Sequence, residues 1–523
     1  MNTTIRLTTI FAAALCLFAS CSKDPAAEPS AKIQQQSLDA WIRVHKPELA
    51  ANRQQVNDNT AYYVEVLDEG EPLSDDVRPL GESESQWVML DFDVRTLTGK
   101  LCLTRSASQA KQENTFTKYT HYVPMYRYCG DSNYGLLEGT YYALRNELEI
   151  GYMNGAAAAE TYTARIGSRL RLYLPASVAY SSSGTSDSAG YGGQYSLDAN
   201  KPVIVDIAVC DTIANPLQRE GVDVDFFARK NGGLRPIPEA GDDEAESVAD
   251  DENGNPETAE DDMYAWRNAV DSIPQVYVAR RYAPSAEAPS FDFGVEIDGA
   301  MHIAPYKSYA PYEDVAELDK RINAALIERF GDPEEHEAGD TIGTGKAVSI
   351  WYIARLLDGF IVDTNLDEVK QIIYGEVSSA GSAMSYTADE KNGSSAISAF
   401  YYGIPQLQYG RWAALLTTSS NGYGASGISG GSNTSTSGGS SYYDYLNYYN
   451  YLNYMNYYNG YYGGYYGGYY NNYYNGYYNM YNMYGYYGGM YGSTGETTST
   501  TTYSTEILPY TPLLFQLYIE AKE

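Results

Sequence analysis

The chain has 523 residues, more than one domain usually holds, and a hydrophobic content of 44% that suffices for buried cores. Acidic residues outnumber basic ones by 67 to 35, and the net charge of −32 argues against a nucleic-acid-binding protein, because phosphate contacts need clustered Lys and Arg. Histidine occurs only 4 times, which disfavours a histidine-based metal site, and we expect no metal or other cofactor.

The N-terminus predicts an exported protein with a lipid anchor. Arg6 precedes a short apolar run, Ile10–Phe18, and small residues then lead to Cys21. This arrangement resembles a bacterial lipobox, in which the cysteine carries lipid; an ordinary secretory signal is the alternative. We therefore expect a signal peptide at 1–21, a lipid on Cys21 and a polar tether at 22–35. The acidic start of the tether resembles surface-export tags of Bacteroidetes lipoproteins. That resemblance implies the outer membrane, at the cell surface or facing the periplasm.

Residues 36–213 predict a first module made mainly of strands. The expected elements are a helix at Ser37–Arg53, strands at Thr60–Gly70, Gln86–Leu97, Arg169–Tyr180 and Lys201–Val209, and an aromatic loop or edge strand at Lys118–Tyr128. The apolar side of the helix should carry Leu38, Trp41, Ile42 and Val44.

Three cysteines follow Cys21 in the sequence, and their odd number prevents full pairing within one chain. None of them stands in a CxxC spacing, which disfavours a metal or redox site. A disulfide between Cys102 and Cys129 and simple buried thiols remain alternatives.

Residues 214–274 predict a linker between two modules. Its centre, Glu239–Asp262, has no basic residue and almost no large apolar one, so it cannot bury enough surface to offset its chain entropy. We expect a disordered acidic linker. A calcium-binding loop is the alternative, but the run lacks the DxDxDG spacing with a distal Glu.

Residues 275–523 predict a second module of mixed helices and strands. The expected elements are a helix at Tyr312–Gly331, a strand–turn–strand at Lys346–Asn365, a short helix and loop at Ser394–Gly410, and strands at Arg411–Gly424 and Ile507–Glu520. An insertion at 428–504 repeats Tyr, Gly and Asn and has almost no aliphatic residue. Such a low-complexity segment cannot build a core, so we expect a flexible arm, a tyrosine-rich contact surface, or both.

One pattern occurs in both modules: a strand, a tyrosine, an open loop and a strand punctuated by proline. It spans Arg169–Val209 in the first module and Arg411–Glu520 in the second, where the loop holds the long insertion. The sequence therefore predicts two copies of one module.

The second module resembles the FK506-binding-protein (FKBP) family of peptidyl-prolyl isomerases. The family's strand Tyr, Asp-Gly turn and hydrophobe–Asp pair correspond to Tyr352, Asp358-Gly359 and Val362-Asp363. Its helix start corresponds to Ala396, Ile397 and Phe400, its loop Tyr-Gly to Tyr423-Gly424, and its closing strand to Ile507, Pro509 and Phe515. The resemblance implies an α+β fold, with each of two modules a bent antiparallel sheet wrapped on a short helix.

The same resemblance implies roles for these residues. Tyr423 would donate its hydroxyl to a substrate carbonyl, and Asp363 would order the rim of the pocket near the twisted carbonyl. Tyr352, the third catalytic candidate, would form part of the pocket wall. The apolar walls would be Val362, Ile397, Phe400, Ile507 and Phe515. Taken singly, each of these residues fits an ordinary core, strand or turn position better than a pocket position. Taken jointly, in the order of the family, they favour the pocket.

The first module departs from the family where the chemistry lies. Phe92 replaces the strand tyrosine, Cys102 and Leu103 replace the hydrophobe–Asp pair, and Val205 replaces the closing Phe. Tyr180 matches the loop tyrosine, and we expect Tyr152 at the floor of the pocket. This module would bind peptide with little or no catalysis.

These features predict a cell-envelope lipoprotein that acts as a prolyl isomerase and folding helper on proline-containing polypeptide clients, with catalysis in the second module only. The alternative is a non-catalytic FKBP-like scaffold that docks in an outer-membrane protein complex through its tyrosine-rich arm.

Overall fold

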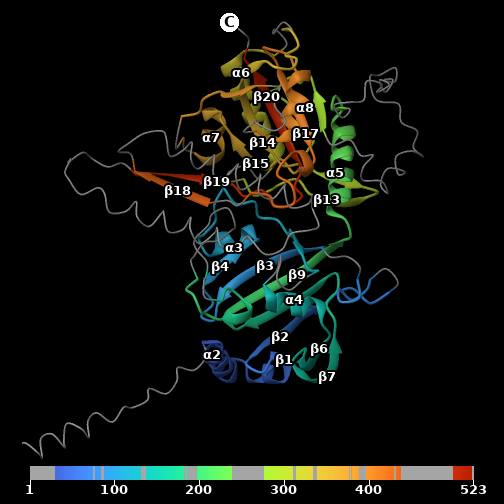
Figure 1. Ribbon diagram of the computed structural model, residues 1–523, viewed down its shortest axis with the longest axis vertical. Coiled ribbons are helices and arrows are strands. Elements are labelled where there is room, and N and C mark those ends of the chain that lie inside the picture. Colours follow the sequence, from blue (N-terminus) through green and yellow to red (C-terminus); the bar gives the residue numbers. More distant parts are fainter. Residues whose placement is uncertain are drawn as a thin grey trace, which may run out of the picture. The chain divides into compact units, whose positions relative to one another are not determined.

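The computed structural model describes residues 30–74, 77–83, 87–130, 137–181, 184, 197–237, 276–309, 314–333, 339–375, 377, 380–387, 396–428, 431–436 and 499–520. The chain divides into two compact units (Figure 1). Unit 1 comprises Met1–Leu103, Arg127–Ser186 and Tyr195–Thr212; unit 2 comprises Thr104–Tyr126, Asp187–Gln194 and Ile213–Glu523. Cys21, the acidic run Glu239–Asp262 and residues 437–498 of the insertion lie outside the described residues.

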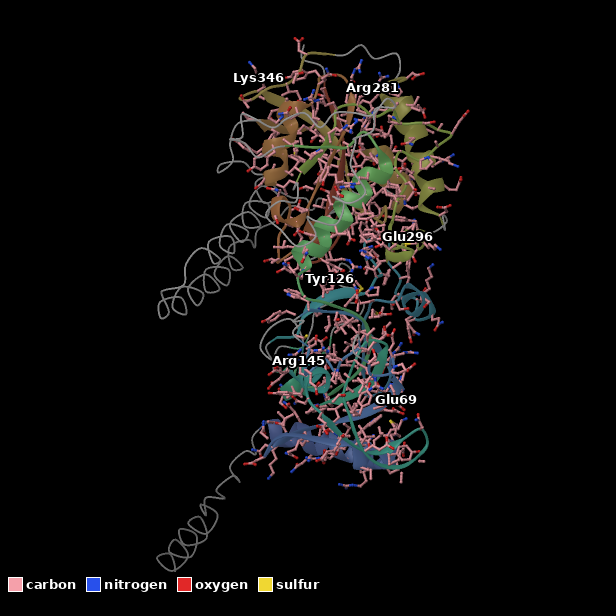
Figure 2. The ribbon with its side chains drawn as sticks, turned by 90° about the vertical axis from the view of Figure 1, so that its right-hand side faces the viewer. Glu69, Tyr126, Arg145, Arg281, Glu296 and Lys346 are labelled. Carbon is pink, nitrogen blue, oxygen red and sulfur yellow. The ribbon has the colours of Figure 1, made fainter. Side chains whose placement is uncertain are left out.

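Unit 1 is built on a seven-stranded sheet with the order β1-β2-β8-β9-β3-β4, in which β5 also pairs with β3. The elements are α2 (Ser30–His45), η1 (Pro47–Asn52), β1 (Arg53–Asn57), β2 (Thr60–Glu69), β3 (Trp87–Thr96), β4 (Leu101–Thr104), β5 (Met125–Tyr128), α4 (Glu138–Arg145), β6 (Leu148–Met153), β7 (Ala156–Tyr162), β8 (Ser168–Leu174), η2 (Ala176–Val178) and β9 (Val203–Ile213). Glu69 at the end of β2 and Arg145 at the end of α4 are labelled in Figure 2.

Helix α2 covers one face of this sheet because its apolar residues recur four apart. Leu38 and Ile42 are buried in a cluster with Tyr63 and Tyr173 of the sheet. Val44, which was expected on the same side, is 72% exposed. The helix also begins at Ser30, inside the range expected to be a tether. Within that range, Gln35 accepts a hydrogen bond from the Ala61 N–H of β2, which joins this part of the helix to the sheet.

Unit 2 is built on a second seven-stranded sheet, with the order β10-β11-β17-β20-β14-β15 and with β16 paired to β14. The elements are α3 (Ala107–Gln112), α5 (Pro216–Asn231), β10 (Arg235–Pro236), β11 (Val276–Ala279), β12 (Val295–Ile297), β13 (Ala300–Ile303), α6 (Val315–Phe330), β14 (Ala347–Arg355), β15 (Ile361–Thr364), α7 (Asp367–Tyr374), β16 (Met384–Thr387), α8 (Ser398–Gly403), η6 (Ile404–Gln406), β17 (Trp412–Thr417), η7 (Ser419–Asn421), β18 (Gly431–Thr436), β19 (Ser499–Ser504) and β20 (Leu513–Ile519). Strands β18 and β19 pair with each other at the base of the insertion.

The two seven-stranded sheets have the same strand order. Strands β2, β8, β9 and β3 of unit 1 take the places of β11, β17, β20 and β14 of unit 2. Equivalent pairs face each other across the central strands, with Leu172 opposite Val205 in one sheet and Leu415 opposite Phe515 in the other. Val205 therefore occupies the position of Phe515, as the sequence predicts.

The central strands of unit 2 are buried on both faces. All six residues of β17 are buried, and alternate residues of β20 enter different clusters, with Phe515 on one face and Leu514 on the other. Helix α8 brings Phe400 against Phe515 on the first face. Helix α6 covers the opposite face, where Phe330 packs on Trp412 of β17.

Helix α6 agrees with its prediction because both of its end signals are used. The Asp314 side chain accepts a hydrogen bond from the Ala316 N–H at the start, and Gly331 follows the last turn with a positive φ of 87°. The described residues contain no helix that is both long and apolar enough to cross a bilayer.

Helix α5 corrects the expected linker at 214–274. Asn215 caps it by accepting from the Gln218 N–H, and Val224 and Phe227 are buried in a cluster with residues of β11 and β17. Figure 2 shows α5 in green lying along unit 2. The acidic residues of this stretch obscured an apolar helical face in the sequence, and the long C-terminal part of unit 2 begins at Ile213.

Candidate functional site

The apolar residues proposed as pocket walls lie together in unit 2. Val362, Phe400, Ile507 and Phe515 are buried in one cluster, and Ile397 is packed against it. Tyr352 and Tyr423 pack on the same cluster as partly buried side chains. Seven of the eight residues proposed for the site thus share one apolar cluster, although they come from four separate parts of the chain.

The floor of this cluster is made by aromatic rings in edge-to-face contact. The ring centroids of Phe400 and Phe515 lie 5.0 Å apart at an angle of 75°. Tyr386 of β16, which the sequence did not single out, meets Phe400 at 5.9 Å and 81°. Ile397 begins α8 by accepting a hydrogen bond from the Phe400 N–H, and this turn directs Phe400 to the sheet.

Tyr352 and Asp363 form a hydroxyl–carboxylate pair beside the cluster. The Tyr352 hydroxyl donates to Asp363 Oδ2 at 2.6 Å, and the Thr364 N–H donates to Asp363 Oδ1 at 2.8 Å. The Asp363 side chain is solvent-exposed, yet desolvation by the protein around it raises its pKa, and the bonds from Tyr352 and Thr364 oppose that rise. The carboxyl is therefore more easily protonated than an ordinary surface aspartate.

Tyr423 lies on a tight loop between β17 and the insertion. The Ser419 carbonyl accepts from the N–H groups of Gly422 and Gly424 at 2.8 Å, so the residues on both sides of Tyr423 are tied to one atom. Ile507 is placed by a reciprocal pair of backbone bonds with Ile428, of 2.7 and 3.0 Å. The start and the end of the insertion are thereby joined at the site.

The segment Thr104–Tyr126, which runs from the end of β4 to the start of β5, belongs to unit 2 and packs beside these residues. Tyr119 stacks on Tyr374 of α7 with 4.2 Å between ring centroids. The His121 ring contacts Asp358, with 2.6 Å between Nε2 and Oδ2, in the turn that leads to Val362 and Asp363. No sequence pattern predicts these contacts, because they join residues that are far apart in the chain.

The equivalent positions of unit 1 keep the fold but lose the pair. The β-turns match, since Thr96 N–H donates to the Lys100 carbonyl at 2.9 Å and Leu356 N–H donates to the Phe360 carbonyl at 2.8 Å. Counting from these turns, Phe92 stands for Tyr352 and Leu103 for Asp363. No hydroxyl–carboxylate pair can form from these two side chains.

Tyr152 is not at the floor of unit 1, contrary to the sequence interpretation. It lies on β6, and its ring packs in the cluster under α2. The helix equivalent to α8 is α4, in which Leu137 and Thr140 occupy the places of Ile397 and Phe400. The tyrosine was misassigned because the floor helix occurs earlier in the sequence than expected.

The cysteines of unit 1 are free thiols. Cys102 and Cys129 are buried and Cys210 is exposed. Burial raises the pKa of the Cys102 and Cys129 thiols, which makes them less reactive than ordinary cysteines. Within the described ranges, no group of three or more His, Cys, Asp or Glu side chains is arranged to hold a metal ion.

The walls of the candidate site are closed in this structure. Val362, Phe400, Ile507 and Phe515 are each only 4–6% exposed. A polar cavity of about 170 Å³ occurs instead in unit 1, and it is lined by Gln54, Gln55, Val56, Tyr62, Tyr142, Asn146, Glu147 and Leu148. None of the residues proposed for the site contributes to that cavity.

Comparison with known proteins finds likeness at the level of solved structures only. No family model matches the chain, and no curated protein matches it. Similar structures include a peptidyl-prolyl cis-trans isomerase from Pseudomonas syringae (15% identity, 35% of this chain and 95% of that one, TM-score 0.21). The three FKBP domains of wheat FKBP73 are also similar (8% identity, 88% and 94% covered, TM-score 0.19). FkpA from Escherichia coli is a third (14% identity, 41% and 74% covered, TM-score 0.20).

Proposed function

We propose that unit 2 is a peptidyl-prolyl cis–trans isomerase of the FKBP type. The observation that carries the proposal is the pair of Tyr352 and Asp363, joined at 2.6 Å at the edge of an apolar cluster that also holds Tyr423. Unit 1 has the same strand order without this pair, so the proposal places catalysis in unit 2 alone.

The proposed mechanism depends on apolar surroundings for the X–Pro bond and needs no nucleophile. Rotation about an X–Pro bond breaks amide resonance and faces a barrier of about 18–20 kcal/mol. The planar amide is more dipolar than the twisted one, so the dry walls around Phe400 and Phe515 would favour the twisted state. Tyr423 would donate a hydrogen bond to the substrate carbonyl. Asp363, held by Tyr352, would order the rim.

The cellular setting is part of the same proposal. Cys21 would carry a lipid that anchors the chain to the outer membrane, at the cell surface or facing the periplasm. The clients would be exported polypeptides whose folding is limited by the rate of proline isomerisation. That step takes tens to hundreds of seconds without catalysis.

A non-catalytic scaffold is the second candidate, and the closed walls favour it. Phe400 and Phe515 pack directly on each other, and both are nearly inaccessible to solvent. In this alternative the protein would dock in an outer-membrane complex, and residues 437–498 of the tyrosine-rich arm would supply the contact surface.

An exchange measurement on the full chain separates the two candidates. Cis–trans exchange of a short proline peptide is followed by NMR with the wild-type chain and with a variant in which residues 437–498 are replaced by a Gly/Ser turn. An isomerase accelerates exchange, and the shortened variant does so as well because it keeps every residue proposed for the site. If neither folded protein accelerates exchange, the scaffold candidate is favoured.

A further inference from the structure

Glu220 is a buried acid on α5, the helix that precedes the second sheet in the chain. Its side chain is only 3% exposed. Its carboxyl accepts the Ser419 hydroxyl at 2.8 Å and the Ser419 N–H at 3.2 Å. Ser419 is itself 1% exposed and begins the loop that carries Tyr423. An acid at this depth needs such donors because an unpaired buried carboxyl is costly.

The loop of Tyr423 has a close counterpart in unit 1, around Tyr180. Gly424 N–H donates to the Ser419 carbonyl at 2.8 Å, and Ser181 N–H donates to the Ala176 carbonyl at 2.7 Å. Gly427 N–H and Gly184 N–H likewise donate to the carbonyls of the two tyrosines, at 3.1 and 3.2 Å. The backbones agree as well, since φ is +64° at Gly424 and +50° at Ser181.

The two loops differ at the residue on which both depend. Unit 2 has Ser419, whose side chain and N–H reach Glu220, whereas unit 1 has Ala176, which offers no hydroxyl. Because unit 1 forms the same turn with alanine, the serine and the glutamate are not required for the turn to fold. They hold the loop to α5 in the one unit that also has Asp363.

The surroundings of Glu220 favour its neutral form. Desolvation raises the pKa of Glu220 to about 8, Asp223 adds to the rise, and the two bonds from Ser419 oppose it.

The other charged groups on and around α5 have partners of their own. Asp223 faces Arg219 of its own helix at 3.5 Å and His302 of β13 at 2.8 Å. Further along α5, Asp225 contacts Arg229 and the Tyr277 hydroxyl of β11, and Lys230 contacts Asp292. Ser419 is the polar group of the loop that bonds to Glu220.

We propose that Glu220 is a positioning residue for Tyr423, which it holds through Ser419 in a proton-dependent manner; this inference rests on the proposed isomerase function. The Ser419 carbonyl ties Gly422 and Gly424, which flank Tyr423, so a shift of Ser419 moves the tyrosine. Near neutral pH the carboxyl is neutral and stays buried against Ser419. At alkaline pH it becomes charged, and the loop is released from α5.

The test uses the full chain and two independent measurements. Hydrogen-exchange protection of residues 418–424 is measured at about pH 6 and about pH 9, with residues 175–181 of unit 1 as the internal control. The kcat/KM for proline isomerisation is measured at the same pH values. The variants are Glu220→Gln, which stays neutral and keeps the shape, and Ser419→Ala, which copies unit 1.

In the wild type we expect protection of residues 418–424, corrected for intrinsic exchange, and kcat/KM to fall about tenfold from the lower to the higher pH. Glu220→Gln should remove this fall, and Ser419→Ala should lower both quantities already at the lower pH. Residues 175–181 should not respond in any protein.

The inference is overturned if Glu220→Gln and Ser419→Ala match the wild type at both pH values. If the wild type shows no isomerisation but protection changes as expected, the proposed function fails and the anchoring of the loop by Glu220 stands.

Discussion

The guanidinium of Arg105 lies 2.8 Å from the carboxylate of Glu506, and the two side chains are 0% and 3% exposed. Arg105 also donates to the carbonyls of His121 and Val123, at 2.7 and 3.0 Å. One residue therefore fixes the segment Thr104–Tyr126 within unit 2, next to Ile507 of the candidate site. The second module is completed by residues that lie between two strands of the first module in the sequence.

The first prediction concerns this ion pair. Arg105→Met leaves the Glu506 carboxylate buried without its partner, so we expect a loss of about 3–5 kcal/mol in the free energy of unfolding. Adding Glu506→Leu should recover most of that loss, because both charges are then gone. Urea unfolding of the full chain, followed by a probe in unit 2, measures both effects.

Arg171 and Asp206 of unit 1 provide the matched control. They lie 2.6 Å apart, but their side chains are 35% and 26% exposed. Arg171→Met should cost no more than about 1 kcal/mol. Equal losses for Arg105→Met and Arg171→Met, or no recovery in the double variant, contradict the assigned role of Arg105.

The second prediction concerns the acidic run Glu239–Asp262. Its composition favours proteolysis there before the flanking units are cut. The N-terminal product would carry both α5 and the segment Thr104–Tyr126, whose buried contacts are with residues of the C-terminal product. We therefore expect the two products to elute together in size-exclusion chromatography without denaturant. Separate elution of two folded products disagrees with this account, as does protection of the run.

The third prediction is the pH dependence of stability that Glu220 imposes. Its pKa rises from an ordinary value of 4.5 to about 8 on folding. The folded state therefore binds the proton more tightly, and its stability falls as the pH rises from about 5 to about 8. One proton limits the slope to about 1.4 kcal/mol per pH unit.

Glu220→Gln should remove this contribution. The free energy of unfolding of unit 2, measured for the full chain at several pH values, should decline less steeply in the variant than in the wild type. Parallel curves for the two proteins between about pH 5 and about pH 8 rule out a protonated Glu220 in the folded state.

The strands around the candidate site were predictable because their signals are local. The turns at Gly99 and Gly359, both with positive φ, set the register that places Leu103 and Asp363 at the same position. The burial of Phe400 and Phe515 follows from apolar residues in a short helix and a strand, and the structure agrees. Turn residues and the apolar pattern were therefore sufficient to predict which positions of the two modules are equivalent.

The contacts between distant residues were not predictable. Arg105 and Glu506 are 401 positions apart, and neither stands in a motif. Glu220 was hidden in a stretch whose acidic composition suggested a linker, although α5 buries Val224 and Phe227. Tyr152 was placed wrongly because the chain around it forms β6, while the equivalent helix α4 lies earlier in the sequence. Tertiary packing decided each of these cases.

The fourth prediction concerns the lipid. Small residues before Cys21 and a polar stretch after it predict that Cys21 is the acylated first residue of the mature protein. Mass spectrometry of the N-terminal peptide from the native membrane fraction should show a cysteine with added acyl chains. A mature N-terminus at another residue, without lipid, excludes the anchor.

The last prediction concerns Asp363, the residue that most clearly separates the two units. Asp363→Leu gives unit 2 the residue that unit 1 has at the equivalent position, Leu103, and removes the acceptor of the Tyr352 hydroxyl. We expect kcat/KM for proline isomerisation to fall about tenfold. The control variant is Leu103→Asp in unit 1, where Phe92 offers no hydroxyl, and it should leave kcat/KM unchanged.

The measurement that tests the account most directly is therefore cis–trans exchange of a proline peptide with the full chain, the Asp363→Leu variant and the Leu103→Asp variant side by side. The account predicts acceleration by the wild type and by Leu103→Asp, and a loss of about tenfold in Asp363→Leu with its fold intact. Equal rates for the wild type and Asp363→Leu, or exchange no faster than without protein, contradict an isomerase site in unit 2.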